Sequence, residues 1–145
     1  MIYADTGFLV SLYLQESTSA EAIAVYSSLT TPVKLTNINR LEFENAIHRA
    51  VFQTRITAAE SAILLSDFDL DIRNGVYGES GLDTDAMFIE ASTLSARHTP
   101  VMGTRTLDLM HVAAADMLMC QVILSFDKRQ RQSATALGMQ VLPTP

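Results

Sequence analysis

Four acidic side chains occupy positions from which one folded chain could bring them together. Asp5 and Asp127 each follow a short apolar run that is typical of a strand buried on both faces. Asp108 lies in the first turn of a predicted helix, and Glu42 lies early in another. Ligands bind at the carboxyl ends of the strands in open parallel sheets, so we expect Asp5, Asp108 and Asp127 to meet at that edge.

The chemistry that such a group of acids favours is metal binding. Several carboxylates within a few ångströms repel one another unless they share a cation or a proton. A hard divalent ion removes the repulsion, and Mg²⁺ commonly takes one or two carboxylates together with waters and a substrate phosphate. Thr6 and Ser125 add hydroxyl groups near the same edge. The spacing therefore predicts an acidic pocket for a metal ion.

Each acid also has a purely local explanation. Asp108 suits the positive end of a helix dipole, and Asp5 could cap a helix. Asp127 could open a turn, and Glu42 could be an ordinary surface residue of its helix. Glu44 points about 200° away from Glu42 around the same helix, so we expect Glu44 to lie in solvent.

Basic residues near the acids are candidates for contacts with phosphate groups. Arg105 lies three residues before Asp108, and Lys128 and Arg129 directly follow the last acid. Arg131 is a weaker candidate, since a solvated surface explains it equally well. The helical spacing turns His111 toward the core, where we expect it to pack rather than to take part in catalysis.

The elements that must position these residues alternate along the chain. Strands are predicted over residues 1–4, 33–36, 122–124 and 139–142. Helices are predicted over residues 6–14, 18–26, 38–52, 57–68, 83–97, 106–118 and 130–137. Residues 69–81 are predicted to be a loop with a short extended piece near Val76, and residues 98–103 a connector. This alternation implies a three-layer α/β/α sandwich around a central, mostly parallel sheet.

Length and composition limit the classes of protein that fit. A chain of 145 residues predicts one domain, residues 1–145. No apolar run approaches the ~20 residues that span a bilayer, and no basic segment precedes an apolar one at the N-terminus. Cys120 is the one cysteine, which excludes an internal disulfide and favours a buried thiol in a reducing compartment. We therefore expect a cytoplasmic protein without a membrane segment.

The net charge of −6 argues against unselective binding of nucleic acid, which depends on neutralising phosphates. Such a chain binds no nucleic acid, binds it locally through a few arginines and a metal, or needs another subunit for the contact. The residues 75–78 lack the spacing and the lysine of a phosphate-binding loop. No His/Cys cluster has zinc spacing, and no Ser or Cys lies in a nucleophile-elbow motif.

Four blocks of the sequence, in the same order, resemble the PIN-domain family in its VapC-like branch. They are residues 1–7 (MIYADTG), 41–46 (LEFENA), 103–115 (GTRTLDLMHVAAA) and 124–130 (LSFDKRQ), and residues 136–141 resemble the family's last helix and strand. The resemblance covers almost the whole chain. Its one small departure is Ser-Phe-Asp at residues 125–127, where Thr-Phe-Asp is commoner in the family.

The family comprises small metal-dependent ribonucleases, many of them toxins held by an antitoxin. The resemblance therefore implies a Mg²⁺- or Mn²⁺-dependent endoribonuclease, the toxin of a type II toxin–antitoxin pair, that acts on RNA and forms a homodimer. It implies that the metal-site acids are Asp5, Glu42, Asp108 and Asp127, with Thr6 and Ser125 as accessory positions.

Two alternatives remain open at this point. One is a catalytically silent PIN-like module that binds RNA or protein, and the other is a Mg²⁺-binding phosphate-receiver domain. A receiver would need paired acids after its first strand, where this chain offers only Asp5. The apolar surface expected to dock an antitoxin, or to pair two copies, consists of Phe8, Leu9, Leu12, Tyr13, Phe43, Ile47, Val51 and Phe52.

Overall fold

A computed structural model describes residues 1–144 and shows short strands alternating with helices. The strands are β1 (Ile2–Ala4), β2 (Val33–Leu35), β3 (Tyr77–Glu79), β4 (Val122–Leu124) and β5 (Gln140–Leu142). The helices are α1 (Thr6–Tyr13), α2 (Ser19–Ser27), α3 (Asn37–Phe52), α4 (Ala58–Arg73), α5 (Thr84–Met102), α6 (Thr106–Met117) and α7 (Lys128–Ala136). Pro145, the last residue of the predicted domain, lies outside the described residues.

The strands form one sheet in the order β3-β2-β1-β4-β5, and every neighbouring pair is parallel. The predicted α/β class is confirmed, with a sheet that is parallel throughout residues 1–144. The chain moves outward in one direction from β1 to β3 and in the other from β4 to β5, so the strand order reverses between β1 and β4. This order differs from the 2-1-3-4-5 order of flavodoxin-like folds such as CheY, which removes the phosphate-receiver alternative.

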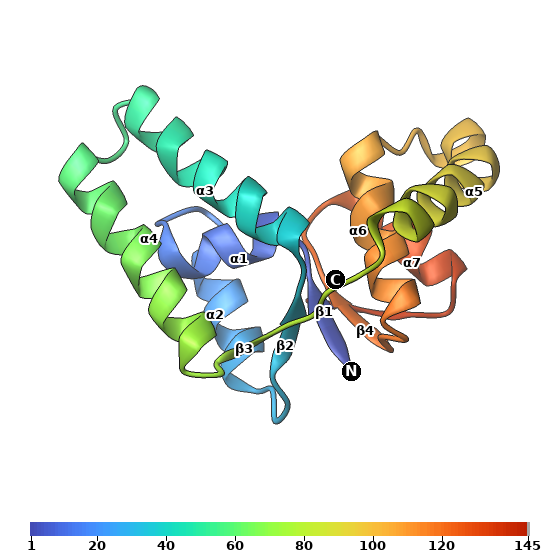
Figure 1. Cartoon of the computed structure of the whole chain (residues 1–145), viewed down its shortest axis with the longest axis horizontal. Helices are drawn as coiled ribbons and strands as arrows, with labels where there is room; N and C mark the ends of the chain where they lie inside the picture. Colours follow the sequence, from blue (N-terminus) through green and yellow to red (C-terminus); the bar gives the residue numbers. More distant parts are fainter. Residues whose placement is uncertain (145) are drawn as a thin grey trace.

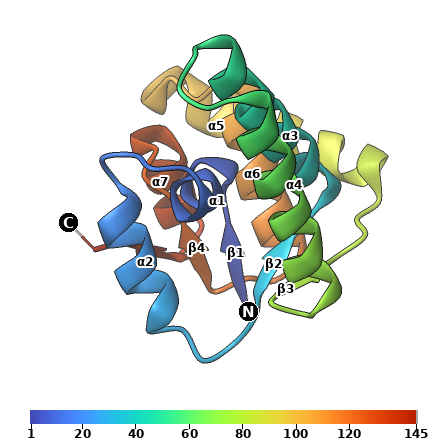
Figure 2. The same cartoon turned by 90° about the vertical axis from the view of Figure 1, so that its left-hand side faces the viewer.

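Helices cover both faces of the sheet and give the predicted three layers (Figure 1). Helices α1 to α4 lie on one face, the side turned toward the viewer in Figure 2, and α5 to α7 lie on the other. Successive side chains of a strand point to opposite faces. Tyr3 accordingly packs with Leu94 and Val112 on the α5–α7 side, whereas Ala4 packs with Phe8 and Ile47 on the α1–α4 side.

Two helices extend further than the sequence predicted. Helix α4 continues to Arg73, into the predicted loop, and ends before Gly75, whose φ of 75° suits the left-handed conformation. The extended piece near Val76 is confirmed as β3. Helix α5 runs through Pro100 to Met102, so the predicted connector at residues 98–103 is wrong. Buried contacts of this helix with α6 and α7 outweigh the one backbone hydrogen bond that a proline removes.

Half of the apolar residues predicted for docking belong to the core, and Leu12, Tyr13 and Val51 are partly buried. Phe8, Leu9, Phe43 and Ile47 are fully buried, which corrects the prediction for these four residues. Phe52, by contrast, is 88% exposed at the end of α3. Glu44 is exposed as predicted, and Cys120 is a buried free thiol.

Across residues 1–144, none of the helices combines the length and the apolar character that a membrane span requires.

Candidate active site

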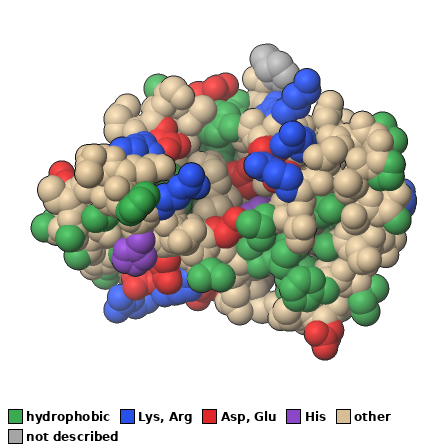
Figure 3. Space-filling view, turned by 90° about the horizontal axis from the view of Figure 1, so that it is seen from above, with side chains coloured by type: hydrophobic (Ala, Val, Ile, Leu, Met, Phe, Trp, Pro, Cys, Tyr) green, Lys and Arg blue, Asp and Glu red, His purple; other side chains and the backbone are tan. Residues whose placement is uncertain are grey.

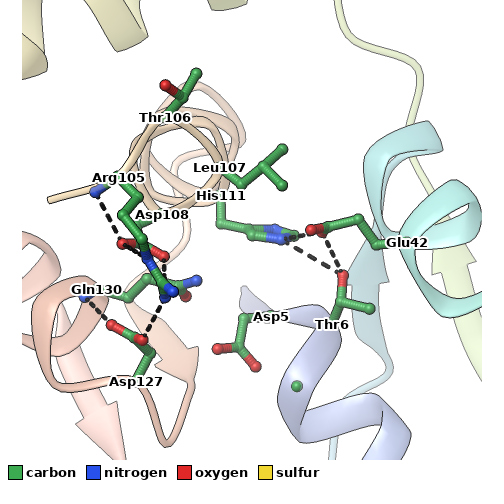
Figure 4. A pocket seen from close by; sticks show the side chains of 11 residues that line it. Asp5, Thr6, Glu42, Arg105, Thr106, Leu107, Asp108, His111, Asp127 and Gln130 are labelled. Carbon is green, nitrogen blue, oxygen red and sulfur yellow. Dashed lines mark hydrogen bonds and ion pairs between the residues drawn. The ribbon is translucent and has the colours of Figure 1, made fainter. Parts of the chain in front are cut away.

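A cavity of about 510 Å³ opens at the carboxyl edge of the sheet, beside the point where the strand order reverses. Figure 3 looks down on this edge and shows acidic side chains in the hollow and basic side chains on its rim. The lining residues are Asp5, Thr6, Gly7, Glu42, Arg105, Thr106, Leu107, Asp108, His111, Asp127 and Gln130 (Figure 4). All four acids singled out from the sequence thus line one cavity, together with Thr6.

Asp5 is buried, with 3% of its surface exposed. It is the N-cap of α1: its Oδ1 accepts the backbone N–H of Phe8 at 2.6 Å, and its Oδ2 accepts the hydroxyl of Ser125 at 2.6 Å. No ion pair within residues 1–144 involves this carboxylate. Burial therefore raises the pKa of Asp5, because the charged form lacks the water that would solvate it.

Asp108 is also buried, but it has a cationic partner. Its carboxylate accepts the backbone N–H of Arg105 at 2.9 Å, and the guanidinium donates to it from Nε at 3.0 Å and Nη2 at 3.1 Å. Burial acts to raise the pKa of Asp108, but the hydrogen bonds and charge of Arg105 outweigh it, so the pKa lies below its usual value.

Asp127 lies across the cavity from Asp108 and shares the same cation. It is the N-cap of α7, where its Oδ1 accepts the backbone N–H of Arg129 at 2.8 Å and that of Gln130 at 3.1 Å. Its Oδ2 accepts Nη2 of Arg105 at 2.8 Å. The Arg105 guanidinium thus lies between two of the four acids (Figure 4).

Glu42 reaches the cavity from α3, on the opposite side. Its Oε2 accepts the Thr6 hydroxyl at 2.8 Å and lies 2.6 Å from Nε2 of His111. Partial burial acts to raise the pKa of Glu42, but the hydrogen bond and charge of His111 and the Thr6 hydroxyl hold it below its usual value. Ser125 does not line the cavity; it is fully buried behind Asp5 and accepts the backbone N–H of Asp127 at 3.1 Å.

The donor set suits a hard divalent cation, since it consists of carboxylate and hydroxyl oxygens around a buried anion, Asp5, that has no ion-pair partner within residues 1–144. The side chains are not gathered around one point, however. Within residues 1–144, no three His, Cys, Asp or Glu side chains stand close enough to hold one ion in common. Arg105 spans two of the acids, and His111 and Thr6 hold Glu42 at the far wall.

The basic residues predicted to contact phosphate fall into two groups. Lys128 and Arg129 are exposed at the start of α7, and neither forms an ion pair within residues 1–144. Arg105 is turned to the acids instead. Arg131 donates to the backbone carbonyls of Ser125 and Pro143, each at 2.7 Å, so its role is to brace the ends of β4 and β5.

Among the lining residues that the sequence did not single out as site residues, His111 and Gln130 contact the acids. His111 is buried, as predicted, but its ring reaches Glu42, a contact that packing alone did not suggest. The available signal was its spacing: it follows Asp108 by three residues and so shares its helix face. Gln130 lies at the floor near Ser125, and its hydrogen bonding also acts to lower the pKa of Asp108.

Comparisons with known proteins agree with this architecture. A family model for the PIN domain matches residues 2–135. A solved structure of VapC20 from Mycobacterium tuberculosis, described as a toxin that cleaves the sarcin–ricin loop, is similar in fold, with 18% sequence identity and a TM-score of 0.71 over 96% of each chain. FitAcB from Neisseria gonorrhoeae is similar at 15% identity and a TM-score of 0.69, over 97% of this chain and 96% of that one. No curated protein matches the sequence significantly.

Proposed function

Because this chain belongs to the PIN-domain family, we propose that it is a Mg²⁺- or Mn²⁺-dependent endoribonuclease that hydrolyses RNA phosphodiester bonds. The observation that carries the proposal is the meeting of four carboxylates in one cavity at the reversal of strand order, the usual ligand site of such sheets. A catalytically silent module is less favoured, since none of the four acids is missing from the cavity.

In this proposal Asp5, Asp108 and Asp127, with Glu42, hold the metal. A divalent ion bound there would lower the pKa of the attacking water and neutralise the charge that develops on the leaving oxygen. Ser125 orients Asp5 through the 2.6 Å hydrogen bond, so it acts behind the acids and not on the substrate. Arg105 forms ion pairs with Asp108 and Asp127, so it competes with the metal for these two carboxylates. It can contact a phosphate only after it has released them.

Cations beside the acids offer binding to the RNA backbone. Lys128 and Arg129 are exposed on one side of the cavity. On the other side a polar groove of about 540 Å³ runs along α3 and shares Thr6 and Glu42 with the cavity. Arg49 lines this groove and forms no ion pair within residues 1–144. Local cations of this kind fit an acidic chain that must still bind a polyanion.

We further propose that the chain is the toxin of a type II pair and is held by a cationic segment of an antitoxin. The acidic cavity would attract such a segment. An apolar groove of about 290 Å³, lined in part by Tyr13, Ile56 and Leu64, meets the polar groove along α3 at Leu14 and Arg55. A homodimer is the expected form of the chain without its antitoxin. Co-purification with the product of the adjacent reading frame, and mass measurement of the lone chain, test these two statements.

Removal of metal tests the enzymatic proposal. The purified chain should cleave a structured RNA in Mg²⁺ or Mn²⁺, lose cleavage in EDTA and regain it when either ion is restored. A divalent ion that binds only the folded state should also raise the melting temperature. Cleavage that persists in EDTA, or a melting temperature that is indifferent to millimolar Mn²⁺ and Mg²⁺, would contradict the proposal.

A further inference from the structure

Three of the four acids are oriented by backbone groups of their own helices, and the fourth is not. Asp5 and Asp127 are N-caps, and Asp108 closes a capping box at the start of α6. Glu42 lies inside α3, beyond the first turn, where every backbone N–H is used within the helix. Its long side chain therefore depends on other side chains for its orientation.

Two side chains hold Glu42, and both hold the same oxygen. The Thr6 hydroxyl donates to Oε2 at 2.8 Å, and Nε2 of His111 lies 2.6 Å from Oε2. An ionised carboxylate only accepts hydrogen bonds, so Nε2 carries the hydrogen in this contact. No hydrogen bond within residues 1–144 is formed to Oε1, which is left free at the cavity.

The ring of His111 is itself fixed from behind. Its Nδ1 lies 2.9 Å from the hydroxyl of Tyr3, which is fully buried in β1. The same hydroxyl lies 2.9 Å from Oδ1 of Asn39, so its one hydrogen serves either the ring or this amide oxygen. Asn39 in turn donates to the backbone carbonyl of Ala4 at 2.9 Å. The ring is 2% exposed and can turn away from Glu42 only by breaking this buried chain of hydrogen bonds.

We propose that His111, braced by Tyr3, is a positioning residue that holds the Glu42 carboxylate in place for the metal of the cavity. The inference rests on the proposed function, since it assigns Glu42 to a metal ion. In known metal sites, removing a residue that holds a ligand from outside the coordination sphere lowers the metal affinity by ~10–100-fold.

Two amide substitutions separate positioning from packing. His111→Gln places an amide nitrogen near the position of Nε2 and keeps a donor for Glu42, while it gives up the contact with Tyr3. His111→Asn places its amide near the position of Nδ1, so it keeps the hydrogen bond with Tyr3 and loses the one with Glu42. Both substitutions remove the ring from the same buried place, so a role in packing alone predicts similar losses for both.

The measurement is Mn²⁺ affinity of the metal-free full chain, by electron paramagnetic resonance of free Mn²⁺. His111→Asn should weaken the affinity by about 10-fold or more, and His111→Gln should keep most of it. His98 gives the matched control: it is also buried, it bonds through Nδ1 to Ser133 at 2.6 Å, and it does not line the cavity. His98→Asn and His98→Gln should leave Mn²⁺ affinity unchanged.

Equal losses for the two His111 variants, or wild-type affinity of His111→Asn, would overturn the positioning role. Failure of the wild-type chain to bind Mn²⁺ would instead refute the proposed metal site. The hydrogen bond from His111 to Glu42 is then tested without metal by ¹⁵N-resolved NMR spectra of the imidazole ring. They should show a protonated Nε2 whose downfield proton is lost in Glu42→Ala, and an unprotonated Nε2 would overturn the inference.

Discussion

Asp5, Asp108 and Asp127 each serve a helix and the cavity at the same time. Asp5 and Asp127 cap helices, and Asp108 accepts the backbone N–H of Arg105 within its capping box. The local explanations of these acids are therefore compatible with a role in the cavity, because a cap uses only some of the acceptor sites of a carboxylate. Helix N-termini also stabilise negative charge, which offsets part of the repulsion among the acids.

Asp5→Asn should stabilise the metal-free chain at neutral pH. Burial raises the pKa of Asp5 in the folded chain above its unfolded value, so folding favours the protonated form. That contribution is complete below the unfolded pKa of about 4 and is lost as pH rises through the folded pKa. The variant should thus melt a few degrees above wild type at pH 7, and the difference should shrink as the pH falls to about 4.

Calorimetry of wild type and Asp5→Asn between pH 4 and pH 7 measures whether the variant has the higher melting temperature. Asp67→Asn is the control, since Asp67 is exposed in the interior of α4 and its substitution should not shift the melting temperature in this way. A lower melting temperature for Asp5→Asn at pH 7 would mean that the lost Ser125 hydrogen bond outweighs the cost of burying the charge.

Arg105→Gln should tighten Mn²⁺ binding, because the guanidinium occupies the space between Asp108 and Asp127. The side chain of Arg105 is 63% exposed, but its partner Asp108 is buried and has a lowered pKa because of Arg105. The metal-free variant should therefore melt below wild type, since a buried carboxylate loses its cationic partner. Arg129→Gln removes the same charge nearby without breaking an ion pair of the described residues, and it should not tighten binding. Titration calorimetry at low salt measures the difference; weaker binding by Arg105→Gln would show that Arg105 supports the metal site.

At the scale of elements, the sequence predicted what depends on local patterns. Apolar runs marked β1, β2, β4 and β5, and the capping box at Thr57 and Glu60 marked the start of α4. The end of α5 was missed because the helix continues through Pro100, a residue that usually ends one. The end of α4 was missed because the glycines and mixed charge of residues 69–81 suggested a loop, although the helix continues until just before Gly75. The meeting of Asp5, Asp108 and Asp127 could be predicted because the carboxyl ends of parallel strands lie at one edge of the sheet.

What the sequence could not predict is contact between distant side chains. The bond between His111 and Glu42 joins residues 69 positions apart, and the ring's other contact reaches back to Tyr3. The same holds for Arg105, whose spacing suits either a phosphate or a carboxylate partner. Its choice of Asp127, 22 residues away, depends on how α6 and α7 meet at the edge of the sheet.

Helix α3 carries a polar stripe that leads away from the cavity, and Arg49→Gln should weaken RNA binding there. Glu42, Arg49 and Gln53 recur near one face of α3, and all three line the adjoining groove. The variant should raise KM for RNA with kcat largely kept, and the salt dependence of binding should fall by about 0.7 in slope for one lost contact with single-stranded RNA.

Arg73→Gln is the control for Arg49, because it removes the same charge at the exposed end of α4, outside the groove. Equal effects of the two substitutions would show that only net charge matters, and no RNA contact would then be assigned to α3.

At the scale of the whole molecule, the architecture brings opposite charges to one edge. The chain carries a net charge of −6, yet Arg49 lies on one side of the acidic cavity and Lys128 and Arg129 lie on the other. Helices cover both faces of the sheet (Figure 1), and the view from above in Figure 3 shows a hollow with acidic side chains. RNA binding by such a molecule should therefore depend on divalent ions that offset the acids.

The central claim is that the cavity acids hold metal for RNA hydrolysis, and Asp108→Asn tests it most directly. An amide is a poor ligand for a hard cation, so cleavage of a structured RNA in Mg²⁺ should fall by more than the ~10–100-fold typical of outer partners. Asp116→Asn makes the same change on the same helix at an exposed position outside the cavity, and it should cleave as wild type does. Wild-type cleavage by a folded Asp108→Asn chain would contradict the account.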